Sequence, residues 1–298
     1  MSTSSISSIC SVLISSTKGS SSSLGCVHES WVHEGCSTVT EGTPATTESV
    51  RPTSEKTAIF RFLAGVLIPL MNIVGRYRVR GLENVPKAGP FVVSPNHYSN
   101  VDPIVIGIGL WKSGRMPRYF AKASLFRIPI VGAILLKAEQ IPVERSGNSR
   151  DGSGPLRQAQ QIAAAGHAVV IYPEGSLTRD PDGWPMRGKY GAVRTALDAG
   201  IPLIPAASWG AHLIMPQSTN RLSFFPRKSV DIVFGEPVDL SEFANRPRDS
   251  RVLAEATLKL MTAITALVEG LRDEAAPTQR WNPTEHGQTE IGRFNDKR

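Results

Sequence analysis

Cysteine is nearly absent from the 298-residue sequence: there are three, and all of them precede residue 40. The rest of the chain contains no thiol, which excludes from it both a disulfide framework and a cysteine nucleophile. It also lacks a G-x-S-x-G pattern, so a strand–turn–helix that exposes a nucleophilic serine is not predicted. Any chemistry carried out beyond residue 40 therefore has to use other side chains.

Long apolar runs are also missing. Residues 62–74 form a nearly apolar stretch of 13 residues, whereas a membrane-spanning helix needs about 20. Arg61 precedes this stretch and Arg76 follows it. A short apolar helix with basic ends is typical of a segment lying in the membrane interface. Packing against the domain's own core is an equally good interpretation, and the sequence leaves both open.

The N-terminal region has little that could form a core. Residues 1–55 are rich in serine and threonine and are predicted to be disordered, because they bury too little apolar surface to offset the entropy lost on ordering. Cys26, His28, His33 and Cys36 share one short window of this region. Their spacing is not that of a familiar zinc finger, so no metal site is predicted.

Positive charge is unevenly distributed. The net charge is +7, and Glu139 and Glu144 are the only acids between residues 112 and 150. The same stretch holds eight basic residues: Lys112, Arg115, Arg118, Lys122, Arg127, Lys137, Arg145 and Arg150. Such an excess indicates an anionic partner, either a membrane surface or a phosphorylated substrate, or else simply a solvated surface. Nucleic acid is not expected as a partner, because no zinc finger, ribonucleoprotein pattern or helix-turn-helix is present.

Beyond residue 79, strand-like and helix-like segments alternate. This alternation predicts an α/β fold with a mostly parallel central sheet flanked by helices, preceded by an apolar helical segment at 56–78. The expected strands are 91–94, 118–122, 140–143, 168–172, 201–207 and 230–235. Helices are expected at 156–166, 191–200 and, with an amphipathic pattern, 250–271. We predict one domain over 79–272 and a loose polar tail over 273–298.

Polar residues follow several of these strands, at the sheet edge where working groups gather. His97 and Asp102 come directly after the first strand, in PNHYSNVDP. A histidine held by a carboxylate is fixed in one tautomer and can accept a proton from a hydroxyl. The same letters also fit a helix start, with Asp102 as the N-cap and Pro103 at the first helical position. Both interpretations stand at this point.

Later strands end on further charged or flexible residues. One ends at Arg145 in IPVER, and another ends at Glu174 and Gly175 in YPEGSLTR, with Arg179 close behind. Arginine binds phosphate well through paired charge-assisted hydrogen bonds. Taken one at a time, each of these residues also fits an ordinary surface charge or turn.

Together, and in this order, the segments resemble a known family. NHYSNVD resembles the histidine-x4-aspartate motif of the glycerolipid acyltransferases, and IPVER, YPEGSLTR and GIPLIPAA resemble their second, third and fourth blocks. MRGKYGAVRTA is similar to the family's lysine-glycine segment. The resemblance covers roughly residues 60–240 and is strongest to the branch that acylates 1-acylglycerol 3-phosphate.

The resemblance implies transfer of a fatty acyl group from acyl-CoA or acyl carrier protein to a lysophospholipid hydroxyl, giving phosphatidic acid. His97 would be the general base and Asp102 its orienting carboxylate. Arg145 and Arg179 would hold the acceptor phosphate, in a site shaped by Glu174 and Gly175. No cofactor and no acyl-enzyme are implied. Lipid substrates imply peripheral or monotopic association with a membrane surface, on its cytoplasmic face.

One departure from the family pattern affects these assignments. The third block usually reads EGTR, whereas this chain has EGSLTR, with two more residues before Arg179. Ser176 and Thr178 are then both counterparts of the family's threonine. The shared motifs also leave open glycerol 3-phosphate or another lysolipid or glycolysolipid as the acceptor, and a catalytically silent, membrane-associated lipid-binding protein is the alternative from another class.

Overall fold

The computed structural model describes residues 55–289 except 144–160, 163, 218 and 220. The serine-rich N-terminal tract and its Cys/His window lie outside the described residues. So do Arg145 and most of the helix expected at 156–166.

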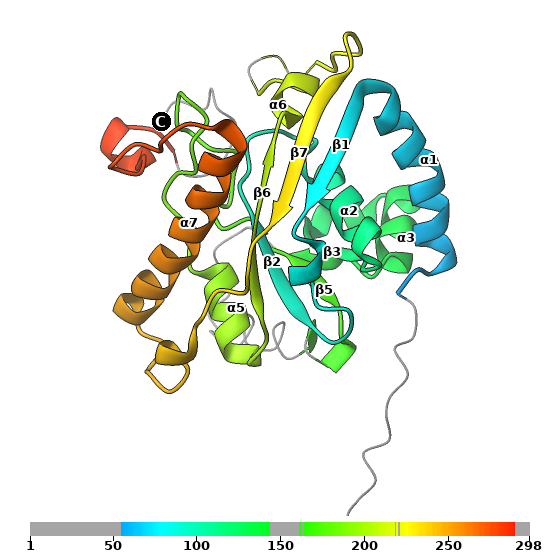
Figure 1. The fold of residues 1–298 in the computed structure, drawn as a ribbon. Helices are drawn as coiled ribbons and strands as arrows, with labels where there is room; N and C mark the ends of the chain where they lie inside the picture. The colour runs from blue at the N-terminus through cyan, green and yellow to red at the C-terminus, as the bar shows by residue number, and fades with distance from the viewer. Residues whose placement is uncertain (1–54, 144–160, 163, 218, 220, 290–298) are drawn as a thin grey trace, which may run out of the picture. The chain divides into compact units, whose positions relative to one another are not determined.

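The described strands form one seven-stranded sheet in the order β1-β7-β6-β2-β5-β3-β4 (Figure 1). Their bounds are β1 Gly75–Arg80, β2 Phe91–Pro95, β3 Pro117–Lys122, β4 Ile141–Val143, β5 Ala168–Val170, β6 Leu203–Trp209 and β7 Lys228–Phe234. β6 and β7 pair antiparallel, and the other neighbouring strands pair parallel. The predicted α/β fold with a mostly parallel sheet is confirmed.

The antiparallel pairing of β6 and β7 determines which loops and helix ends lie together at one end of the strands, here called an edge of the sheet. β2, β5 and β6 run in one direction, while β7 and its parallel partner β1 run in the other. The edge at which β2, β5 and β6 end is therefore the edge at which β1 and β7 begin. Polar loops after the central strands, the end of the helix that leads into β1, and the loop that leads into β7 all lie at this edge.

Helices cover both faces of the sheet (Figure 1). The longer helices are α1 Ala58–Val74, α2 Asp102–Ser113, α3 Pro129–Lys137, α5 Gly191–Ala199 and α7 Ser250–Arg272. Shorter ones are η1 Leu82–Asn84, η2 Ala123–Arg127, α6 Ala211–Ile214, η3 Ser241–Phe243 and η4 Pro283–His286. α1, α2 and α3 lie on one side, and α5 and α7 lie on the other.

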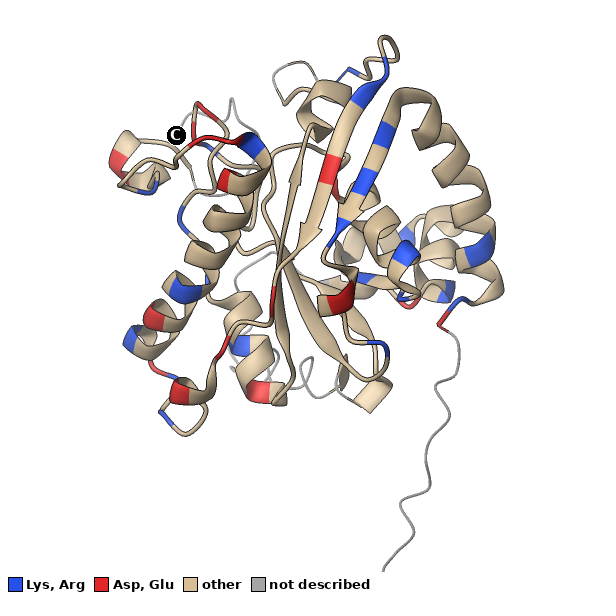
Figure 2. Cartoon of the chain, in the orientation of Figure 1, with Lys and Arg blue, Asp and Glu red and all other residues tan. Residues whose placement is uncertain are grey.

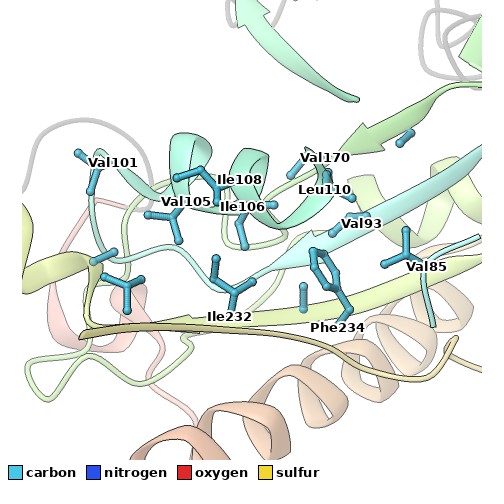
Figure 3. Close-up of a cluster of buried hydrophobic side chains, with 14 of the residues drawn as sticks. Val85, Val93, Val101, Val105, Ile106, Ile108, Leu110, Val170, Ile232 and Phe234 are labelled. Atoms are coloured by element: carbon cyan, nitrogen blue, oxygen red, sulfur yellow. The ribbon is translucent and has the colours of Figure 1, made fainter. Parts of the chain in front are cut away.

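Alternating side chains of the strands build a core on each face. Phe91 and Val93 belong to the cluster under α2. Figure 3 shows Val93 there, together with Ile232 and Phe234 from β7. Val92, between Phe91 and Val93, packs into the cluster under α5 and α7. The central strands are buried on both faces, which explains why their sequences read as continuous apolar runs.

Several predicted elements are confirmed, and two segments differ from the prediction. The helix expected at 250–271 is α7, whose N-cap Asp249 accepts a hydrogen bond from Val252 N at 2.8 Å. Residues 75–78, joined to the apolar helix in the prediction, instead begin β1. In β1, arginines alternate with Tyr77 and Val79, as expected of a half-exposed edge strand. The sequence analysis did not predict this strand because it contains no apolar run.

The C-terminal tail is not loose where it is described. Arg187 N donates to Trp281 O at 2.9 Å, and Pro283 is buried. The rings of Trp281 and His286 stack with their centroids 3.5 Å apart. A tail with few aliphatic residues is thus fixed by backbone bonds and one aromatic pair, neither of which follows from its composition.

The two sides of α1 differ in exposure. One side packs on the domain through Phe60, Met71 and Val74. The opposite side presents an exposed stripe at helical spacing: Phe62, Val66, Leu70 and Ile73, which are 50–65% exposed. In the described part of the chain, no helix has the length and apolar character needed to cross a membrane.

Candidate active site

The loop after β2 is fixed by bonds to the neighbouring strand β6. Asn96 Nδ2 donates to Ser208 O at 3.1 Å, and Ser208 N donates back to Asn96 Oδ1 at 2.9 Å. The phenol of Tyr98 also donates to Ser208 O. His97 lies between these two anchors, so its backbone has little freedom.

His97 and Asp102 form a hydrogen-bonded pair. His97 Nδ1 lies 3.0 Å from Asp102 Oδ2, with 17% of the histidine side chain exposed and none of the aspartate. Because Nδ1 faces the carboxylate, the pair favours the tautomer in which Nε2 is the free, basic nitrogen. A partly exposed Nε2 backed by a buried carboxylate is suited to removing a proton from a bound hydroxyl.

Of the two interpretations of Asp102, its role as the N-cap of α2 is not observed. The helix begins at Asp102 itself, its N-cap is Val101, and no side chain caps it. Asp102 Oδ2 instead accepts from the backbone of the loop before the helix, from Tyr98 N and Ser99 N at 2.8 Å each. The carboxylate therefore closes the loop around the histidine, and the helix start fixes where it points.

Glu174 connects this loop to the loop after β5. Its Oε1 accepts from His97 N at 2.9 Å, and its Oε2 accepts from Met186 N at 3.0 Å. Burial raises its pKa to about 8, against the opposing effect of these two N–H donors. Glu174 holds the backbone of His97 in place, a positioning role that the motif alone does not specify.

The two additional residues of EGSLTR lie between two contacts to the same histidine. Glu174 accepts from His97 N, and Thr178 N donates to His97 O at 2.6 Å. Thr178 Oγ1 donates to Trp184 O at 2.7 Å, which joins this loop to the segment that follows. Thr178 rather than Ser176 thus makes the buried contacts.

Gly175 is needed for two reasons. Its φ is +74°, a left-handed value that favours glycine, and a Cβ there would lie 3.1 Å from Lys189 Cδ. Lys189 therefore crosses directly over the Gly175 turn. It also lines, with Glu174 and Pro283, a cavity of about 170 Å³.

The structure brings only some of the predicted site residues together. His97, Asp102 and Glu174 are joined by hydrogen bonds, and Gly175 is adjacent to them. Arg179 follows in the same loop and is buried, with 3% of its surface exposed. Arg145 lies outside the described residues.

Tyr172 is a neighbour of the histidine that the sequence analysis did not single out. Its ring lies over that of His97, with centroids 4.0 Å apart and planes tilted by 30°. Its hydroxyl and Asp102 Oδ1 are buried and have no hydrogen-bond partner among the described residues. The sequence did carry a signal for Tyr172, because this residue directly precedes the PEG turn at the end of a strand.

An apolar cavity of about 230 Å³ lies between α1, α2, α3 and β3. Its lining includes Pro103 and Ile104, which follow Asp102 in the chain. Its remaining lining is almost wholly apolar: Phe60, Leu63, Ala64, Leu67, Ile68, Gly107, Ile108, Trp111, Met116, Pro117, Tyr119, Ile134, Leu135, Ala138 and Gln140. The inner side of α1 thus forms a wall of this cavity.

Two buried arginines correct the expected basic surface. Arg115 and Arg118, counted among the eight basic residues, are 3% and 1% exposed. Arg115 bonds to Glu55, and Arg118 bonds to Glu139 at 2.5 Å. These two residues serve packing and are not available to an anionic partner.

A histidine–carboxylate pair thus lies where β2 ends, at the carboxyl edge of an α/β sheet. The model of the acyltransferase family matches residues 76–209, which include all of this pair. The chain is 30% identical to the 1-acyl-sn-glycerol-3-phosphate acyltransferase of Bacillus subtilis over 199 residues, which are 66% of this chain and 90% of that protein. The chain belongs to the acyltransferase family.

More distant relatives agree with this placement. A chloroplastic 1-acyl-sn-glycerol-3-phosphate acyltransferase of Brassica napus is 28% identical over 161 residues, 54% of this chain and 44% of that protein. This chain therefore spans less than half the length of that relative. The crystal structure of the 1-acyl-sn-glycerophosphate acyltransferase PlsC from Thermotoga maritima has the same fold, with a TM-score of 0.54 and 23% identity, covering 75% of this chain and 83% of that one.

Proposed function

We propose that the protein transfers a fatty acyl group from a thioester, acyl-CoA or acyl carrier protein, to the free hydroxyl of 1-acylglycerol 3-phosphate, giving phosphatidic acid. The single observation that carries the chemistry is the His97–Asp102 pair, in which Nδ1 lies on the buried carboxylate and Nε2 is left as the basic nitrogen. The names of the relatives support the choice of acceptor.

The reaction needs one proton to move twice. His97 Nε2 takes the proton of the acceptor hydroxyl as its oxygen attacks the thioester carbonyl, and Asp102 stabilises the imidazolium that forms. When the tetrahedral intermediate collapses, the carbon–sulfur bond breaks and the imidazolium returns the proton to the leaving thiolate. This scheme uses no resident cofactor and no acyl-enzyme.

The acceptor phosphate requires cations near the histidine. Arg145 and Arg179 remain our proposal for this role, and Lys189 is a third candidate because it lies over Gly175. Arg280 adds positive charge near Glu174 from the C-terminal segment, and burial lowers its pKa. The phosphate would then bind on the Glu174 side of His97, opposite the apolar cavity.

A fatty acyl chain is the occupant we propose for the apolar cavity. Pro103, which follows Asp102 in the chain, belongs to its lining, so an acyl chain in it would have its carboxyl end directed toward His97. Lining residues from α1 make this helix part of the substrate site. The exposed stripe of α1 would then rest in the membrane interface, giving peripheral or monotopic association at the cytoplasmic face.

One assay tests this function. Purified protein is incubated with radiolabelled acyl-CoA or acyl carrier protein and a panel of acceptors: 1-acylglycerol 3-phosphate, glycerol 3-phosphate and lysolipids without a terminal phosphate. We expect labelled phosphatidic acid from the first acceptor alone. Product from another acceptor would replace the proposed substrate, and no product from any acceptor, with retained binding of lipid, would indicate a silent lipid-binding protein.

A further inference from the structure

Large apolar side chains are exposed in the segment that leads into β7. Leu222, Phe224 and Phe225 are 45%, 48% and 79% exposed, and Phe225 has the largest exposed fraction among the described large apolar residues. We call residues 222–225 the Phe loop. Single exposed apolar residues are normal, but three within four positions form a patch that favours a partner.

The Phe loop is anchored by hydrogen bonds at its serine. Ser223 N donates to Ile214 O at 2.8 Å, and Lys228 Nζ donates to Ser223 Oγ at 2.6 Å. Ser223 is partly buried while its apolar neighbours are exposed. The backbone is thus tied down at the one polar position, and the apolar side chains on both sides of it point away.

The Phe loop lies beside the end of α1. Arg227 donates to Gly75 O at 3.1 Å, and Gly75 pairs with Lys228 at the start of β1 and β7. Leu70 and Ile73, in the last turns of α1, continue the exposed apolar surface. Because β7 runs antiparallel to β6, this surface lies at the sheet edge that carries His97 (Figure 1).

The charges around the Phe loop have one sign. Arg221 and Arg227 are exposed, and the sequence has no acid between Asp198 and Asp231. Figure 2 shows positive charge at the start of β7 and along β1, next to an α1 that is nearly uncharged. Exposed apolar residues bordered by arginines fit the boundary between acyl chains and anionic head groups.

We infer that the Phe loop is a second membrane contact, which inserts into an anionic bilayer beside α1 and turns the His97 edge toward the lipid. This inference rests on the proposed function, since a lipid acceptor has to reach His97 from the membrane. A single helix in the interface leaves the domain free to rotate about the helix axis. A second contact, made by the loop before β7 rather than by α1 itself, opposes that rotation.

The test is co-sedimentation of the full chain with vesicles of phosphatidylglycerol and phosphatidylcholine. We expect F224S/F225S to lower the vesicle partition coefficient about tenfold or more, with unchanged circular dichroism and melting temperature. L258S is the matched control, because Leu258 is 58% exposed on α7, and it should bind like the wild type. R221Q should weaken binding to these vesicles and leave binding to phosphatidylcholine alone unchanged.

Insertion itself is measured with F225W and brominated lipids. Quenching in F225W beyond that of the wild-type tryptophans is expected, and equal quenching would overturn the inference. Vesicle binding of F224S/F225S equal to that of the wild type would also overturn it. A wild-type dimer that becomes a monomer in F224S/F225S, measured by light scattering, would overturn it too, since the patch would then join two copies. Activity on a short-chain acceptor dissolved as monomers separates the two proposals: F224S/F225S should keep it, whereas a failed function would abolish it in the wild type as well.

Discussion

The two ends of the central strands both bury charged groups, and they differ in how completely those groups are bonded. At the end before β2 and β5, Arg115 donates to Glu55 Oε1 at 2.7 Å, to Pro86 O at 2.6 Å, and to Gly89 O and Gly166 O at 2.7 and 3.0 Å. Every nitrogen of its guanidinium has an acceptor. Such an arginine joins loops together and, at 3% exposure, is not presented to a ligand.

The opposite end is bonded incompletely. Asp102 Oδ2 accepts three hydrogen bonds while Oδ1 has no partner among the described residues, and the Tyr172 hydroxyl is likewise unbonded there. His97 keeps Nε2 for another molecule. Burial of charge alone therefore does not distinguish a working site from a structural one. Unused hydrogen-bonding capacity also occurs near Arg115, where His167 Nδ1 has no partner among the described residues, but around His97 it gathers at a partly exposed histidine.

The largest effect is expected at the incompletely bonded end. H97A should lower kcat for acyl transfer by about 10²–10⁴-fold, because general-base assistance is lost, with little change in melting temperature. Steady-state kinetics with 1-acylglycerol 3-phosphate measures this. H286A is the control, since His286 is exposed and lies on the C-terminal segment, and retention of most activity in H97A would contradict the mechanism.

At the fully bonded end the expected effect is on stability. R115A leaves Glu55 and three carbonyls without their donor, and breaking a buried ion pair in this way should lower the free energy of unfolding by about 3–5 kcal/mol. Urea denaturation measures it, with R251A on the exposed side of α7 as the control. Specific activity per folded molecule should stay the same, and a selective loss of kcat in R115A would remove the contrast between the two ends.

Glu174 is buried and hydrogen-bonded like Arg115, and it also contacts His97. Its substitution should therefore have an intermediate effect. E174Q deprives either His97 N or Met186 N of its acceptor, which should lower the free energy of unfolding by about 1–3 kcal/mol.

The same residue should make stability depend on pH. Since the pKa of Glu174 is raised from 4.5 to about 8 in the folded protein, the stability linked to its protonation is present below pH 4.5 and lost as pH rises through 8. Wild-type stability should therefore fall over this range relative to E174Q, as denaturation at pH 5, 7 and 9 will measure, whereas parallel profiles would refute the buried, protonated state. E285Q, at an exposed position, should follow the wild type.

The smallest effect is expected from Y172F. The ring that packs on His97 remains and an unbonded buried hydroxyl is removed, so stability should be unchanged or slightly higher, and kcat should stay within about threefold. Y172A, which removes the ring, is the comparison variant and should lower kcat more. A large loss in Y172F would instead show that the hydroxyl contacts the substrate.

The sequence predicted those parts of the molecule that depend on local pattern. Buried strands appeared as apolar runs, α7 appeared through its period, and His97 and Asp102 through four ordered segments. β1 was not predicted because its alternating arginines have no apolar run. Arg115 was assigned to the surface because its acceptors, such as Gly166, are brought to it only by the folded sheet.

The loop after β2 has a consequence for synthesis of the chain. His97 N is held by a side chain 77 positions later, and Asn96 is held by Ser208, 112 positions later. A growing chain that has not yet emerged as far as residue 208 contains both His97 and Asp102 but lacks Ser208, and one shorter than 174 residues lacks Glu174 as well. The site is thus completed late, by contacts of high sequence separation whose loop-closure entropy has to be met first. A truncated or incompletely folded chain should accordingly carry the motif without the catalyst.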